Sequence, residues 1–243
     1  MNQILVIKEF LKERRPLDSM PSSGNPFITI SRQAGAGGHF LSEALVAEFK
    51  KNKDEQLFQG WHVFDRELTE VIAEDPLLSQ KLDELLSERY HSELREFLDS
   101  LFSGATEQYK FYKQVYRVAY ALAAVGKVIL LGRCGGYVTQ RLPGGLHLRL
   151  IAPEPQRILW IMKKFKIPHD EAQKLIEQRD VDRNKLAKSF FSHNINDPLY
   201  YDMVWNTARV DLREMVAITT QMVTFRAEQA AHRSTPTMTI GGN

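Results

Sequence analysis

The residues best suited to chemistry in this sequence are a glycine-rich run and the side chains around it. The run Gly35-Ala36-Gly37-Gly38 lies between Arg32 and His39. Residues 27–30 before it are rich in Ile, Thr and Phe, which predicts a short buried strand, and apolar residues recur at helical spacing after it. A strand, a glycine turn and a helix direct unpaired backbone N–H groups and the positive helix end at one point, which suits a phosphate.

This loop departs from the common phosphate-binding pattern G-x-x-x-x-G-K-[ST]. When Gly37, the last residue of Gly35-Ala36-Gly37, is aligned with the second glycine of that pattern, Gly38 stands where the lysine would be. No magnesium-ligating hydroxyl follows it, because the next residues are His39 and Phe40. A second interpretation therefore stays open, in which the loop is a tight turn that needs glycine for close packing.

Two further predicted strands end in residues that suit a ligand. Residues 61–64 are followed by Asp65 and Arg66, and residues 128–131 are followed by a Gly-Arg pair that includes Arg133. In open parallel sheets, ligands bind outside the carboxyl ends of the strands. Asp65 either holds a metal-bound water or a hydroxyl, or caps the next helix. Arg133 either binds a phosphate or carboxylate through its planar guanidinium group, or forms a surface ion pair.

A basic helix predicted to begin at Pro168 and to extend to about residue 191 supplies a further cluster. Arg179 and Arg183 are four residues apart and share a helical face, and Asp180 is three residues before Arg183. Arginines placed in this way can neutralise the charge that spreads over oxygen atoms during phosphoryl transfer. The alternative is a solvated charged face, because surface ion pairs are common and weak.

Three sequence motifs together resemble the cytidylate kinase-like family, whose members resemble P-loop nucleoside monophosphate kinases without the usual lysine. Residues 28–38, I-T-I-S-R-Q-A-G-A-G-G, are similar to the opening of that family. Residues 132–136 are similar to its G-R-D-x-G element, with Cys134 in place of the aspartate. Residues 197–207 are similar to its D-P-x-x-Y-D-x-x-x-N-T element.

The resemblance implies an α/β fold, a P-loop NTPase-like three-layer sandwich with a five-stranded parallel sheet. The implied function is ATP-dependent phosphoryl transfer to a nucleoside monophosphate, with CMP or dCMP as the suggested acceptor. Two alternatives stay open, namely a non-catalytic nucleotide-binding or regulatory protein and a kinase for a different small acceptor. The departures at Gly38, Phe40 and Cys134 favour the first of these.

The resemblance also implies roles for individual residues. We expect the loop to bind the donor phosphates, Arg32 to replace part of the missing lysine's charge, and Mg²⁺ to be held mainly by phosphates and water near Asp65. The predicted donor-binding residues are Gly35, Ala36, Gly37, Gly38 and His39; the catalytic residues are Arg32, Arg179 and Arg183; the acceptor-binding residues are Asp65, Arg66 and Arg133.

The domain organisation follows from the same patterns. We expect an N-terminal helix and a linker over residues 1–26, and one kinase-like domain over residues 27–243. Within that domain, residues 66–125 would form a helical acceptor-binding insertion with a break at Ser103-Gly104, and residues 168–195 would form a lid. Further strands are predicted at 146–151 and 203–205, further helices at 154–165 and 211–231, and a loose tail beyond Pro236.

Composition narrows the class of protein. The 243 residues contain 32 Lys and Arg against 30 Asp and Glu, and a net charge of +2 gives no reason to expect a nucleic-acid polymer as partner. No apolar run is long enough to span a membrane. The single cysteine excludes an internal disulfide and fits a reducing cytoplasm. We expect a cytoplasmic monomer or homodimer that binds nucleotide substrates.

Overall fold

The structure is a computed structural model, and it describes residues 3–14, 16–17, 25–102 and 107–234. Three sequence predictions fall wholly or largely outside these ranges: most of the linker before residue 26, the break at Ser103-Gly104, and the tail beyond Pro236.

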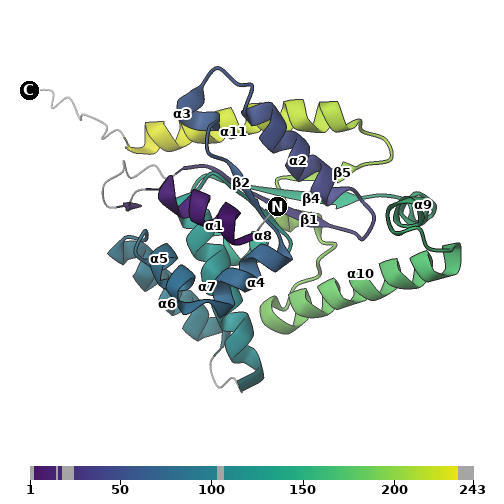
Figure 1. Ribbon diagram of the computed structural model, residues 1–243, viewed down its shortest axis with the longest axis horizontal. Coiled ribbons are helices and arrows are strands. Elements are labelled where there is room, and N and C mark those ends of the chain that lie inside the picture. Colours follow the sequence, from purple (N-terminus) through teal and green to yellow (C-terminus); the bar gives the residue numbers. More distant parts are fainter. Residues whose placement is uncertain (1–2, 15, 18–24, 103–106, 235–243) are drawn as a thin grey trace, which may run out of the picture.

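A five-stranded, all-parallel sheet forms the centre of the molecule (Figure 1). The two strands beside the central one consist mainly of buried residues, as expected for a parallel sheet covered on both faces. In sheet order the strands are β2 (His62–Phe64), β3 (Val128–Leu131), β1 (Phe27–Arg32), β4 (Gly145–Ile151) and β5 (Met203–Asn206). The predicted five-stranded parallel sheet is confirmed.

Helices cover both faces of this sheet, which makes the predicted three layers. One face is covered by α2 (Gly38–Phe49) and α11 (Leu212–Ser234), with the short α3 (Glu55–Phe58) nearby. The other is covered by α7 (Glu107–Val125) and α8 (Gly135–Val138). The remaining helices are α1 (Gln3–Lys12), α4 (Arg66–Glu74), α5 (Pro76–Asp83), α6 (Glu88–Leu101), α9 (Glu154–Phe165) and α10 (His169–Phe191).

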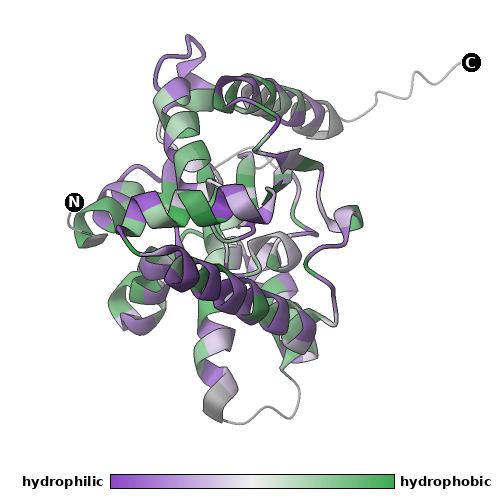
Figure 2. Cartoon of the chain, turned by 90° about the vertical axis from the view of Figure 1, so that its right-hand side faces the viewer, coloured by the Kyte–Doolittle hydropathy of each residue, from purple (hydrophilic) through white to green (hydrophobic). Residues whose placement is uncertain are grey.

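Two apolar cores hold the layers together. One lies between the sheet and the α2 and α11 layer, and it includes Ile28, Leu45 and Met215. The larger one joins the opposite face to α1 and to α4–α7, around Tyr116 and Leu122. Figure 2, which colours each residue by its hydropathy, shows hydrophilic and hydrophobic residues alternating along the helices. The helices α4–α7 all lie between β2 and β3 in the chain, whereas the division into an insertion and a lid stays a prediction.

The order of the strands creates a place for a ligand. Neighbouring strands β1 and β3 are in register, with Ile30 opposite Leu131. The chain leaves β1 toward α2 on one face and leaves β3 toward α8 on the other. Because ligands of open α/β sheets bind where adjacent connections diverge in this way, the crevice after Ile30 and Leu131 is the expected site.

Within the described ranges, no helix combines the length and the apolar character that crossing a bilayer requires. A cytoplasmic location stays a prediction.

Candidate active site

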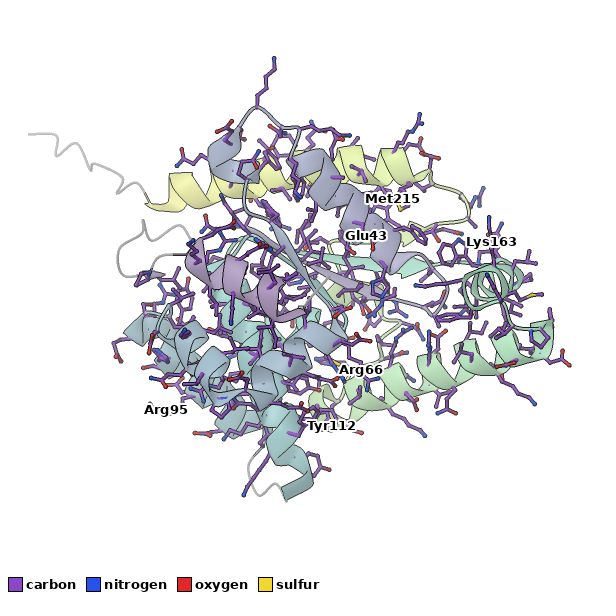
Figure 3. The ribbon with its side chains drawn as sticks, in the orientation of Figure 1. Glu43, Arg66, Arg95, Tyr112, Lys163 and Met215 are labelled. Atoms are coloured by element: carbon purple, nitrogen blue, oxygen red, sulfur yellow. The ribbon has the colours of Figure 1, made fainter. Side chains whose placement is uncertain are left out.

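A cavity of about 600 Å³ opens at the carboxyl ends of β1 and β3. The glycine loop, the first turns of α2 and α4, the segment 131–137, parts of α9 and α10, and the segment before β5 line it. Figure 3 labels Arg66, which lies at the start of α4 on the side toward α10. The predicted site residues that line this cavity are Arg32, Gly35, Gly37, Gly38, His39, Asp65, Arg66, Arg133, Arg179 and Arg183. Ala36 is buried and does not line it.

Different glycines of the loop are needed for different reasons. Gly35 and Gly37 both have positive φ, 82° and 85°, a conformation that favours glycine. A Cβ on Gly35 would lie 2.7 Å from the carbonyl oxygen of Arg157, so this glycine permits close packing. A Cβ on Gly37 would meet no atom within 4 Å. Gly37 therefore leaves open space in front of the helix, where an anion can approach the backbone.

The loop keeps several amide groups available. The Ala34 amide donates to Oδ1 of Asp180 at 2.7 Å, and the Ala36 amide donates to the Gln33 carbonyl at 3.2 Å. In the described part of the chain, no partner is found for the amides of Gly35, Gly37, Gly38 and His39. Because three of these four precede or begin α2, where the helix dipole is positive, they suit an anionic ligand.

Arg32 brings a positive charge into the same space. Its Cγ and Cδ lie 3.2 and 3.3 Å from the position that a Cβ on Gly38 would take, and its Nη1 lies against Cα of Gly132 so closely that a Cβ there would collide. Among the residues that the structure describes, no carboxylate forms an ion pair with it. Burial and the neighbouring Arg183 lower the pKa of Arg32 to about 9, although Asp65 opposes the shift.

A charged network ties the loop to α10. Nη1 of Arg157, a buried side chain of α9, donates to Oδ2 of Asp180 at 2.7 Å and to the Ala34 carbonyl at 3.1 Å. Nη1 of Arg183 donates to Oδ1 of Asp180 at 3.2 Å and to the Arg32 carbonyl at 3.2 Å. Burial lowers the pKa of Arg183, and Asp180 opposes that shift. Asp180 and Arg183 therefore hold α10 on the loop rather than forming a free solvated face.

The start of α4 lies across the cavity from α10. Asp65 caps α4 by accepting a hydrogen bond from the Leu68 amide at 3.1 Å, and it also lines the cavity. Nε of Arg66 lies 3.3 Å from Oε2 of Glu70, and Arg133 pairs with the other carboxylate oxygen of Glu70. One carboxylate therefore gathers two arginines at this end. The ion pair that was the alternative for Arg133 is present, but it lies in the cavity wall rather than on an open surface.

The turn after β3 has an unusual backbone. Gly132, Arg133 and Cys134 all have positive φ, at 91°, 53° and 55°. Such a run of left-handed residues costs conformational free energy. Strained backbone of this kind persists only where the surrounding structure enforces it, and it is common at active sites and ligand-binding segments. Burial and Arg66 lower the pKa of Arg133 to about 10. Burial raises the pKa of the Cys134 thiol to about 12, which makes this cysteine a poor nucleophile at neutral pH.

Comparison with known proteins identifies the family. The sequence profile of the cytidylate kinase-like family matches residues 27–209, well over half of the chain. The chain belongs to the cytidylate kinase-like family. The resemblance seen in the sequence is thereby confirmed, and membership supports a kinase-like activity. No curated protein matches the chain.

Solved structures place this member of the cytidylate kinase-like family among related folds. An uncharacterized protein from Eubacterium ventriosum ATCC 27560 has 16% sequence identity and a TM-score of 0.63, over 83% of this chain and 99% of that one. A shikimate kinase from Bacteroides thetaiotaomicron has 14% identity over 82% of this chain and 98% of that one, with a TM-score of 0.42. The first of these supports the α/β fold; the second is too distant to carry an argument.

The carboxylates of this family member fit a magnesium ion that is held mainly by its substrate. In the described ranges, no group of three or more His, Cys, Asp or Glu side chains is arranged to hold a metal. Asp65 and Asp182 do line the cavity. Mg²⁺ commonly keeps several waters and binds one or two carboxylates together with phosphates. Either carboxylate could therefore be the single protein ligand of such an ion, with phosphates and water completing its coordination.

Sequence reasoning missed an aromatic group at the end of the cavity beside α9. The rings of Phe40 and Trp160 meet edge to face, with centroids 4.4 Å apart, although both side chains remain partly exposed. The guanidinium of Arg179 and the ammonium of Lys164 lie 5.3 and 5.7 Å from the centroid of Phe165. Phe40 and Trp160 are 120 residues apart, so no local pattern could have joined them.

Proposed function

We propose that this protein transfers the γ-phosphoryl group of ATP to a small anionic acceptor, a nucleoside monophosphate. The family suggests CMP or dCMP as that acceptor. The observation that carries the proposal is the cavity that joins free loop amides to five arginines, Arg32, Arg66, Arg133, Arg179 and Arg183. Arg66, Arg133 and Arg183 already pair with Glu70 or Asp180, whereas Arg32 forms no carboxylate ion pair in the described ranges. Burying the charge of Arg32 is costly unless an anion binds it, and a phosphate in the cavity would supply one.

The cavity has two chemically different ends, which suits two substrates. The end beside α9 has the amides of Gly37 and Gly38 next to the exposed rings of Phe40 and Trp160. We assign the donor to this end, with its phosphates on the amides and its base against the rings. The opposite end has Arg66 and Arg133, which we assign to the phosphate of the acceptor.

The side chain of Arg32 reaches from Gly38 to Gly132, between these ends, and Arg183 donates to the Arg32 carbonyl. We assign the moving phosphoryl group to this part of the cavity. In the transfer, an acceptor phosphate oxygen forms the new bond to Pγ, the bond from Pγ to the bridging oxygen breaks, and ADP leaves with that oxygen. The acceptor oxygen is already ionised at neutral pH, so no base is needed to remove a proton. Arg32 and Arg183 would stabilise the charge on the equatorial oxygens. Mg²⁺, when bound, would neutralise charge on the donor phosphates.

A non-catalytic nucleotide-binding protein is the second candidate. It is favoured by three absences: Gly38 replaces the usual lysine, His39 and Phe40 supply no magnesium-ligating hydroxyl after it, and Cys134 replaces the family's aspartate. It predicts tight nucleotide binding and no transfer. A kinase for a different small acceptor would bind the donor in the same way and transfer to another anion, because Cys134 removes an acceptor contact that the family carries.

An acceptor screen with ATP and Mg²⁺ tests the proposal. Nucleoside monophosphates and other small phosphorylated or carboxylated acceptors are incubated with the protein, and ADP and the new product are both measured. The matched variants are Arg32→Ala and Lys185→Ala, because Lys185 is an exposed cation of α10 outside the cavity. Transfer to any acceptor that Arg32→Ala abolishes and Lys185→Ala preserves supports the proposal. ATP binding without transfer to any acceptor would establish the second candidate instead.

A further inference from the structure

Positions 32 and 38 carry residue types in the opposite order to the common phosphate-binding pattern. In G-x-x-x-x-G-K-[ST], the lysine comes six residues after the first glycine. Alignment of the lysine with position 38 puts the first glycine at position 32. This chain has Arg32 where that pattern has glycine, and Gly38 where it has the cation.

The structure gives this exchange a physical reason. Arg32 is the last residue of β1 and Gly38 the first of α2, and the aliphatic part of Arg32 crosses directly over Gly38. A Cβ at position 38 would lie 3.2 Å from Cγ and 3.3 Å from Cδ of Arg32, and 3.0 Å from Cδ1 of Leu131. A side chain at 38 and the arginine at 32 therefore compete for the same space.

A second glycine receives the far end of the same side chain. Nη1 of Arg32 lies against Gly132, where a Cβ would collide with it, and the other two nearest atoms are also from the guanidinium, at 3.2 and 3.4 Å. Gly38 and Gly132 thus form the two walls of a slot that Arg32 fills. The walls come from α2 and from the turn after β3, on the two sides of the crevice.

We propose that the phosphate-binding cation has moved from position 38 to position 32, and that Gly38 and Gly132 are positioning residues whose missing side chains admit Arg32. The inference rests on the proposed function, because it concerns how the same loop meets a polyphosphate. It goes further by treating the absent lysine and the present arginine as one coupled change. A loop that had merely lost its cation would not need two glycines placed around the side chain of Arg32.

Exchange variants test the coupling with inorganic tripolyphosphate as the probe. Arg32→Gly removes the cation, and Gly38→Lys adds one where Arg32 already lies. We expect calorimetry to give each single variant at least about tenfold weaker binding than wild type, in line with the loss of a charge-assisted hydrogen bond. The double variant Arg32→Gly/Gly38→Lys restores the usual order, and we expect it to recover most of that loss. Double-variant affinity no better than that of Arg32→Gly would overturn the inference.

A double-mutant cycle, measured as changes in Tm, tests whether Arg32 lies in the slot and requires no ligand. Gly132→Ala strains a positive-φ position and also collides with Arg32, whereas in an Arg32→Ala background only the strain remains. We expect Gly132→Ala to lower the Tm clearly less in that background than in the wild type. Gly135→Ala is the matched control, because its Cβ would meet only Leu130 and Thr29 at ordinary distances. Its effect on Tm should be the same in both backgrounds.

The two tests separate the failure of the inference from the failure of the proposed function. Equal Tm losses for Gly132→Ala with and without Arg32 would show that the guanidinium does not lie in the slot, whatever the protein binds. If wild type binds no tripolyphosphate, the proposed function fails and the inferred phosphate-binding role of Arg32 fails with it. If the Tm effects of Gly132→Ala and Arg32→Ala are nevertheless non-additive, Gly38 and Gly132 only make room for the packing of Arg32.

Discussion

The carbonyl oxygen of Arg32 accepts a hydrogen bond from Nη1 of Arg183 at 3.2 Å, across 151 residues of sequence. Asp180, one turn before Arg183 on α10, accepts the amide of Ala34 from the same loop. These two bonds fix α10 on the glycine loop and hold Arg183 next to Arg32. A ligand phosphate bound to the loop would therefore lie within the field of Arg183.

Arg183→Ala should lower turnover more than it weakens ATP binding. The charge of Arg183 is needed most when negative charge spreads during transfer, so we expect kcat to fall by about 10²-fold, the usual effect of removing one such group. Steady-state kinetics with the working acceptor, together with the ATP Kd from calorimetry, measure both effects. Lys185→Ala serves as the control on the same helix. An unchanged turnover number would restrict Arg183 to a structural role.

Arg32→Ala should abolish phosphoryl transfer while the fold survives, and His39→Ala should have the smaller effect. Arg32 has no carboxylate ion pair in the described ranges and lines the cavity, so its charge is available to a phosphate. Burial, Arg32 and Lys164 lower the pKa of His39, which keeps its ring neutral at pH 7. Turnover and far-ultraviolet circular dichroism are measured for both variants. A His39→Ala loss as large as that of Arg32→Ala would reverse this assignment.

Gly37→Val should block ATP binding. A side chain at Gly37 meets no protein atom within 4 Å, so its methyl groups would occupy the open space in front of the loop amides. The positive φ adds strain of about 1–2 kcal/mol. Gly60→Val imposes similar strain outside the cavity, since Gly60 also has positive φ, and it controls for stability. Equal ATP affinity in a folded Gly37→Val protein would remove the loop from the binding site.

Much of the fold could be read from local patterns in the sequence. Apolar runs at 128–131 and 146–151 gave β3 and β4, and helical periodicity gave α9 over residues 154–165. The loop, Asp65 and Arg133 were found because parallel strands bring their carboxyl ends to one edge of a sheet. That rule needs no knowledge of the strand order.

Contacts that depend on the strand order and on distant pairs could not be predicted in this way. Arg157 lies in the helix predicted at 154–165, but nothing local indicated that it would bind Asp180 and the Ala34 carbonyl. Glu70 was missed because its pairing with Arg133 depends on how α4 packs beside the turn after β3. Each of these contacts is fixed by tertiary packing rather than by residue spacing.

Trp160 should report the base of a bound nucleotide. Trp160 is 36% exposed beside Phe40 at the end of the cavity assigned to the donor. Of the other two tryptophans, Trp61 is buried, and neither Trp61 nor Trp205 lines the cavity. We expect ATP to quench tryptophan fluorescence and inorganic tripolyphosphate to leave it nearly unchanged, because only ATP carries a base that can stack.

The Trp160→Leu variant extends this test to catalysis. It should lose the quenching, and the KM for ATP should rise about tenfold, in the range expected for one lost base-stacking contact. Leu159→Ala is the control, because Leu159 is exposed on the same helix and does not line the cavity. Equal quenching by ATP and tripolyphosphate would place the base elsewhere.

The affinity for ATP should fall as the pH rises through about 9. Burial and Arg183 lower the pKa of Arg32 to about 9, with smaller contributions from Arg133 and Arg179 and an opposing one from Asp65. Unfolded Arg32 keeps its proton to about pH 12.5, so between pH 9 and that value the unfolded chain binds more protons than the folded one. Raising the pH in that window therefore stabilises the ligand-free folded state relative to the unfolded state. A bound polyphosphate has the opposite effect, because it favours the protonated guanidinium and must recover the missing proton above pH 9.

Calorimetry of metal-free ATP binding between pH 7.5 and 10.5 checks this prediction. ATP loses its last phosphate proton near pH 6, so its own charge is constant over this range. Arg32→Gln is the control, since the pKa of Arg133 is also lowered, to about 10, and its titration affects both proteins alike. The wild-type advantage over Arg32→Gln should be constant below about pH 8 and should shrink through pH 9 to 10. Parallel curves for the two proteins across the whole range would show that Arg32 does not titrate against the bound phosphates.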